Sequence, residues 1–113
     1  FNKDFFGVSL LSHPVSDALL QQCANAAMLA SPIATIECAK SFSSTDFRAD
    51  VVKINVPTLI IHGDADKTVP IEATGNRSAN LIPGATYIIY EGAPHGLWFT
   101  EKERLNQDLI DFI

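Results

Sequence analysis

Two short polar loops carry the residues best suited to chemistry. Residues 62–70 (HGDADKTVP) include Asp64 and Asp66, and residues 91–96 (EGAPHG) include His95. A carboxylate that hydrogen-bonds an imidazole fixes the tautomer of the ring, and it stabilises the imidazolium that forms when the ring takes a proton. Asp66 and His95 are therefore candidates for the acid and base of a nucleophilic triad, provided that the fold brings the two loops together.

The segments that precede these loops predict two parallel strands. Residues 58–62 form an unbroken apolar run between Pro57 and Gly63, which is typical of a strand buried on both faces. Residues 85–90 are rich in β-branched and aromatic side chains and predict a second strand. A helix over residues 71–82 separates the strands, so a right-handed crossover brings both strand ends, with their loops, to one sheet edge.

Three further helices are predicted outside this strand-helix-strand unit. Residues 15–30 place apolar side chains on one stripe, which predicts an amphipathic helix. Ser31 and Pro32 then provide an N-cap and a first-turn proline for a second helix, and we expect the two helices to form an antiparallel pair. Residues 100–103 (TEKE) have the sequence of a capping box at the start of a last helix.

The composition excludes several classes of function. The chain has 113 residues, of which 47% are hydrophobic, so we expect one packed domain or part of one. A net charge of -5 and the lack of a basic cluster argue against nucleic-acid binding. No apolar run has the length of a membrane span, and the first residues do not have the pattern of a signal peptide.

The two cysteines, Cys23 and Cys38, have neither zinc-type nor CxxC spacing. We expect them to be reduced, buried thiols in a cytoplasmic protein, with a disulfide between neighbouring helices as the alternative. A nucleophilic Cys–His pair is disfavoured, because both cysteines lie in apolar helical stripes.

Each loop residue also has a structural interpretation. Aspartates in tight turns commonly accept backbone N–H bonds, and this is the role that we expect for Asp64. Asp64 and Asp66 together could suggest a cation site, but Lys67 stands where another oxygen ligand would be needed, so no metal is expected. His95 alone could be a surface histidine. Its pairing with Asp66 favours the catalytic interpretation.

The loop sequences resemble the C-terminal half of an α/β-hydrolase, in the cofactor-free, non-heme haloperoxidase and aryl-esterase branch. Residues 57–70 (PTLIIHGDADKTVP) and 91–97 (EGAPHGL) are similar to its acid and base loops. Residues 5–7 (FFG) and 39–47 (AKSFSSTDF) are similar to its cap region. The resemblance therefore covers nearly the whole chain.

This resemblance implies an α/β fold in two parts. Residues 1–50 would form part of a helical cap, and residues 51–113 would form the C-terminal, strand-helix-strand-helix part of the hydrolase core. It also implies that Asp66 is the triad acid, that His95 is the base, and that Asp64 is structural.

The sequence lacks the nucleophile that such a triad requires. α/β-Hydrolases present a serine in a Gly-x-Ser-x-Gly elbow upstream of the acid and the base. Residues 7–11 (GVSLL) lack the second glycine, which disfavours Ser9. The chain also begins with Phe1 rather than methionine, and we expect it to be roughly the second half of an enzyme, with little activity by itself.

For this chain joined to the missing half, the resemblance implies acyl transfer without any cofactor. A serine attacks a small ester or carboxylic acid substrate, and His95, held by Asp66, accepts its proton. Water as acceptor gives an esterase, whereas hydrogen peroxide gives a peracid that can oxidise halide. The apolar cap helices suggest small hydrophobic substrates, and residues 97–99 (LWF) either line the pocket or pack in the core.

A different class of function is a non-catalytic fragment or assembly module of hydrolase origin. A sheet with an open edge can pair with a complementary chain or with a second copy of itself. The partner would then be the missing N-terminal half or a homo-oligomer. An upstream serine elbow in the coding sequence favours the enzyme, and its absence favours the module.

Overall fold

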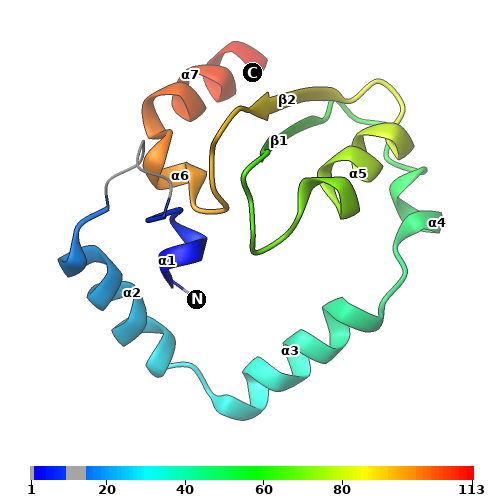
Figure 1. Ribbon diagram of the computed structural model, residues 1–113. Helices are drawn as coiled ribbons and strands as arrows, with labels where there is room; N and C mark the ends of the chain where they lie inside the picture. Colours follow the sequence, from blue (N-terminus) through cyan, green and yellow to red (C-terminus); the bar gives the residue numbers. More distant parts are fainter. Residues whose placement is uncertain (1, 10–14) are drawn as a thin grey trace.

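A parallel two-stranded sheet carries the two loops in the computed structural model, which describes residues 2–9 and 15–113 (Figure 1). Strands β1 (Leu59–Gly63) and β2 (Thr86–Tyr90) pair with Leu59 opposite Thr86 and Gly63 opposite Tyr90. The predicted parallel pairing is confirmed. The other elements are the helices α1 (Asn2–Phe5), α2 (Asp17–Met28), α3 (Pro32–Ser44), α4 (Arg48–Val51), α5 (Gly75–Leu81), α6 (Leu97–Thr100) and α7 (Lys102–Phe112) and the 3₁₀ turn η1 (Ile71–Ala73).

Burial of β1 differs from the prediction. Four of its five residues are only half-buried, and Gly63 alone is buried. A strand is buried on both faces only where further strands and helices flank it, and among the described residues β1 has β2 as its one neighbouring strand.

The predicted crossover helix is interrupted. Thr74 has φ -134° and ψ -82°, which separates η1 from α5. Gly75 follows, and a Cβ atom at this position would lie only 2.7 Å from Nδ1 of His62. Glycine therefore allows the start of α5 to approach β1 more closely than any other residue would.

Helices α2 and α3 begin as predicted but do not form the expected antiparallel pair. The hydroxyl groups of Ser16 and Ser31 accept the N-cap bonds. Figure 1 shows the two helices following one another along an arc, and Leu29 and Ile33, at their junction, are 88% and 75% exposed. An apolar stripe indicates that a helix face needs a cover, but not which element supplies it.

The thiols are unpaired, and the expectation that both are buried is wrong. Cys23 is half-buried and Cys38 is exposed. Helix α3, which carries Cys38, has no buried residue. In the part of the chain that the structure describes, no helix has both the length and the apolar character needed to cross a membrane.

The capping box predicted at residues 100–103 is also wrong. Thr100 is the last residue of α6, and its buried hydroxyl has no hydrogen-bond partner. The N-cap residue of α7 is Glu101, which makes no side-chain capping bond. Because Glu101 N–H bonds to the carbonyl of Leu97, the chain is already helical where the box would require an extended residue.

A buried tyrosine fixes α7 to the end of β2. The Tyr90 hydroxyl donates a hydrogen bond to Asp108, and the guanidinium of Arg104 lies 3.8 Å from the centre of the Tyr90 ring. Burial first, and then the bond to Asp108, raise the pKa of Tyr90 to about 12.

Replacing Gly63 should destabilise the protein more than replacing a glycine that is constrained only by its backbone angles. A Cβ at Gly63 would lie 2.1 Å from the carbonyl oxygen of Ala93, whereas a Cβ at Gly84, which has φ +71°, meets nothing within 4 Å. We expect Gly84→Ala to cost about 1 to 2 kcal/mol and Gly63→Ala to cost clearly more in urea unfolding. Equal costs would contradict the close approach of the two loops.

Tyr90 should also make stability fall in alkali. Its pKa is raised in the folded state, so its contribution is complete below about pH 10, the ordinary tyrosine value, and is lost as the pH rises towards about 12. We expect Tyr90→Phe to be less stable than the wild type at neutral pH and to lose less stability above pH 10. Unfolding curves of the wild type and of Tyr90→Phe across this range measure the difference.

Candidate active site

The buried carboxylate of Asp66 lies in the loop that follows β1. One of its oxygens, Oδ1, accepts the backbone N–H groups of Thr68 and Val69, both at 2.8 Å. The side chain is only 3% exposed, and burial alone would raise its pKa. Hydrogen bonds from Val69, His95 and Thr68 outweigh burial and lower the pKa of Asp66. The acid is therefore an anion at neutral pH.

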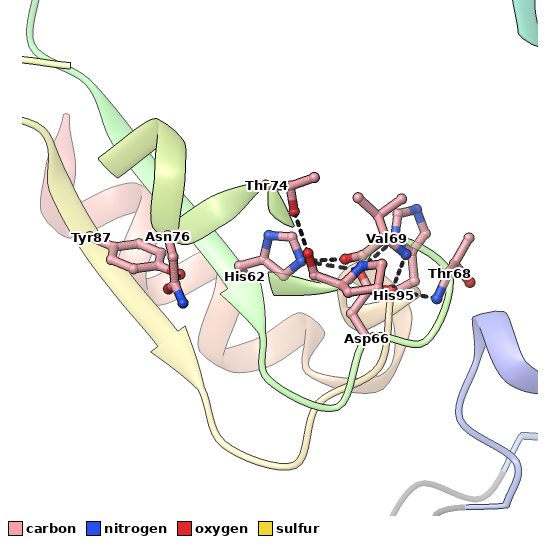
Figure 2. A network of polar contacts seen from close by, with 9 residues as sticks. His62, Asp66, Thr68, Val69, Thr74, Asn76, Tyr87 and His95 are labelled. Atoms are coloured by element: carbon pink, nitrogen blue, oxygen red, sulfur yellow. Dashed lines mark hydrogen bonds and ion pairs between the residues drawn. The ribbon is translucent and has the colours of Figure 1, made fainter. Parts of the chain in front are cut away.

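Asp66 and His95 are in direct contact, as the sequence predicted. Oδ2 of Asp66 lies 2.7 Å from Nδ1 of His95 (Figure 2). A carboxylate can only accept, so the proton of this bond belongs to Nδ1 of the imidazole. Nε2 is thereby left as the nitrogen that can take a proton from a reacting group, and at 33% exposure the side chain of His95 is accessible.

Asp64 ties the acid loop to the base loop. Its Oδ1 accepts the N–H of Gly92 at 2.6 Å, and the N–H of Ala65 bonds to the carbonyl of Ala93 at 3.1 Å. Gly92 takes φ +71° in the turn after β2, a conformation that favours glycine. The turn interpretation of Asp64 agrees with these contacts.

Helix α1 supports His95 from the other end of the chain. The N–H of Gly96 donates to the carbonyl of Phe5 at 2.7 Å, and the Phe5 ring meets the His95 ring edge-on, with centroids 4.7 Å apart. Phe6 is buried beside Gly96, where a Cβ would lie 2.5 Å from its ring. Sequence reasoning missed this support, because a contact between a backbone carbonyl and a distant N–H has no sequence signature.

A second histidine, His62, also approaches Asp66 (Figure 2). Its Nε2 lies 3.2 Å from Oδ2 of Asp66 and 3.0 Å from the carbonyl oxygen of Val69. In the sequence, His62 is only the last residue of a predicted strand. The signal that could have found it is its position four residues before Asp66, across a tight loop.

A cavity of about 260 Å³ adjoins the pair. Its lining comes from β1, from both loops and from the first two residues of α6: Ile61, His62, Asp66, His95, Leu97 and Trp98. Leu97 and Trp98 thus fit the pocket interpretation, whereas Phe99 packs edge-on against Phe6. None of these lining residues is a serine or a cysteine. Within residues 2–9 and 15–113, no three His, Cys, Asp or Glu side chains are arranged to hold a metal.

The arrangement can perform general base catalysis but needs a nucleophile. An ionised carboxylate orients an imidazole, one imidazole nitrogen is free for proton transfer, and a cavity with apolar walls adjoins both. A hydroxyl placed at Nε2 of His95 would complete the triad geometry.

The sequence similarity to known proteins covers all residues of the site. A non-heme chloroperoxidase from Streptomyces lividans is 38% identical over 109 residues, which are 96% of this chain and 40% of the relative. A bifunctional esterase/perhydrolase from Acinetobacter calcoaceticus has the same identity over the same shares of the two chains. A scan against protein-family models finds no match.

Comparison with solved structures indicates the same family. The crystal structure of a bromoperoxidase from Bacillus anthracis superposes with a TM-score of 0.90 at 41% sequence identity, over 99% of this chain and 41% of the bromoperoxidase. The chain thus spans about two-fifths of the length of these relatives. By sequence and by fold, it corresponds to the C-terminal part of an α/β-hydrolase of the non-heme haloperoxidase family.

Proposed function

We propose that this chain supplies the acid, Asp66, and the base, His95, of a Ser-His-Asp triad. The protein would be a carboxyl or aryl esterase with perhydrolase or non-heme haloperoxidase activity, and its nucleophilic serine would come from outside this chain. The observation that carries the proposal is the 2.7 Å hydrogen bond between Oδ2 of Asp66 and Nδ1 of His95.

The proposed reaction is acyl transfer in two stages. Nε2 of His95 takes the serine proton as the hydroxyl attacks the ester carbonyl, and the imidazolium returns that proton to the leaving alcohol. In the second stage His95 removes a proton from the acceptor, which attacks the acyl carbonyl. The bond between the acyl group and serine breaks, and the imidazolium gives its proton to the departing serine oxygen. The anion of Asp66 stabilises the imidazolium in both stages, and it is suited to this because its lowered pKa keeps it charged.

The identity of the acceptor would decide the product. Water gives a carboxylic acid, and hydrogen peroxide gives a peracid that can oxidise halide in solution. The names of the relatives, an esterase/perhydrolase and a chloroperoxidase, support both outcomes. The small cavity beside Leu97 and Trp98 supports short, hydrophobic acyl or aryl groups, and no step of this scheme uses a cofactor.

The rest of the chain would divide between cap and core. We propose that α2 and α3, in residues 1–50, are part of a cap over the site, and that residues 51–113 belong to the core. Apolar side chains that are exposed on both helices, such as Met28 and Ile33, support the need for a covering partner. The unpaired thiols of Cys23 and Cys38 support a cytoplasmic location.

The second candidate is the assembly module, which the open edges of the sheet favour. Only β1 and β2 pair among the described residues, so each has an edge that another strand can occupy. In this case the partner is a complementary chain or a second copy, without turnover. A fluorophosphonate probe tests the two candidates in the protein as it occurs in cells, because it labels an activated serine only in the enzyme.

Replacing the base should abolish turnover. In the protein that joins this chain to its serine-bearing portion, we expect His95→Gln to lower kcat for p-nitrophenyl acetate by about 10³-fold or more, with KM little changed. Lys53→Ala, at an exposed ion pair with Asp50, is the control for handling and folding. A folded His95→Gln variant with near-normal turnover would end the assignment.

Replacing the acid by its amide should be almost as damaging. Because Oδ1 of Asp66 accepts two backbone N–H groups, the amide NH₂ of Asn would take the Oδ2 position and face Nδ1 of His95. The ring would then carry its proton on Nε2, so we expect Asp66→Asn to lower kcat by about 10⁴-fold.

Asp64→Asn is the matched control for this amide substitution. Its oxygen can still accept the N–H of Gly92, so kcat should stay close to that of the wild type. Equal losses of kcat in the two variants would show that Asp66 acts only by holding its loop in shape.

A further inference from the structure

We propose that His62 is a positioning residue, whose Nε2–H group holds the Asp66 carboxylate in the orientation that His95 requires. This inference rests on the proposed function, since it assigns a role within the same triad. It starts from the two contacts of Nε2, 3.0 Å to the carbonyl oxygen of Val69 and 3.2 Å to Oδ2 of Asp66.

The partners of His62 determine its tautomer. A carbonyl oxygen can only accept a hydrogen bond, so the contact with Val69 requires that Nε2 carry a proton and donate it to that carbonyl, while Oδ2 of Asp66 lies 3.2 Å from the same nitrogen. Nδ1 of His95 donates to the same Oδ2 atom from its own side. Two imidazole nitrogens thus lie beside one carboxylate oxygen, and only the His95 ring keeps a free Nε2.

The contacts close a ring that prevents the carboxylate from rotating. Val69 donates its N–H to Oδ1 of Asp66, and its carbonyl accepts from Nε2 of His62, which lies 3.2 Å from Oδ2. Rotation about the bond between Cβ and the carboxyl carbon of Asp66 would break the bonds at both oxygens. Among the described residues, His62 and His95 are the side chains whose ring nitrogens lie within 3.2 Å of Oδ2.

Burial separates the tasks of the two histidines. The side chain of His62 is 15% exposed and that of His95 is 33% exposed. Because Nε2 of His62 carries the proton that it donates to Val69, this nitrogen is not available as a general base. His62 supports the acid, while the free Nε2 of His95 is left for proton transfer.

The His62 ring is itself held in place by α5 and β2 (Figure 2). Gly75 approaches so closely that a Cβ there would lie 2.7 Å from Nδ1 of His62 and 3.0 Å from the hydroxyl of Tyr87. That hydroxyl donates to Oδ1 of Asn76, also on α5. The start of α5 thus lies against the Nδ1 side of the ring, while Nε2 faces Val69 and Asp66, which gives the glycine at position 75 a role in the site.

Two substitutions separate hydrogen bonding from bulk. His62→Gln keeps an N–H donor at nearly the same reach, whereas His62→Leu fills similar space without one. In the complete, serine-bearing protein we expect His62→Leu to lower kcat by about tenfold to 100-fold with KM within about twofold of the wild type. His62→Gln should return kcat to within about threefold of the wild type.

Ile82→Ala is the control for a general loss of stability, since Ile82 is buried and lies outside the cavity lining. Its kcat should be unchanged well below the melting temperature. Wild-type kcat in His62→Leu would overturn the proposal, and so would equal losses in His62→Leu and His62→Gln, because a donor would then make no difference.

A measurement on the unmodified protein remains decisive if His62→Leu does not fold. Two-bond ¹H–¹⁵N spectra report which imidazole nitrogens carry protons, and we expect Nε2 of His62 to be protonated at neutral pH. An unprotonated Nε2 would overturn the proposal. His95→Gln distinguishes this failure from failure of the triad itself: if that variant is inactive while His62→Leu is fully active, only the role of His62 is wrong.

Discussion

The charge on Asp66 has to be satisfied inside the protein, and much of the surrounding structure meets this requirement. An ionised carboxylate that is nearly excluded from water is costly unless its oxygens receive hydrogen bonds. Two backbone N–H groups occupy one oxygen, and two imidazoles approach the other. The loop from His62 to Val69 folds around the carboxylate, so the same contacts that make burial tolerable also orient the acid.

The parallel sheet converts this local arrangement into a site. Because β1 and β2 run in the same direction, their carboxyl ends meet, and Asp64 and Gly63 fasten the loops where they leave the sheet. The lack of a side chain at Gly63 allows the carbonyl of Ala93 to approach the end of β1. His95 is thus held at the distance of a hydrogen bond by backbone geometry as well as by its own contact with Asp66.

The sequence was sufficient where the structure is local or follows general rules of topology. Both strands, the crossover and the pairing of Asp66 with His95 follow from apolar runs, turn residues and the handedness of parallel connections. The packing of α2 and α3 could not be predicted, because periodicity identifies an apolar face and not its neighbour. The capping box failed because α6 had already made Thr100 helical. Phe5 was missed because its backbone contact with Gly96 has no sequence signature. For His62 the one available signal was its position four residues before Asp66.

The contact between Phe5 and the base loop has a consequence for the order of folding. Phe5 and Gly96 are joined by a backbone hydrogen bond although 90 residues lie between them in the chain, so forming it closes a long loop and costs chain entropy. The sheet and the bond between Asp66 and His95 need only the nearby crossover. Such a difference in sequence separation favours early assembly of the strand pair and late docking of the first helix. The His95 ring would then contact the Phe5 ring last, so the site would be completed in a step separate from formation of the sheet.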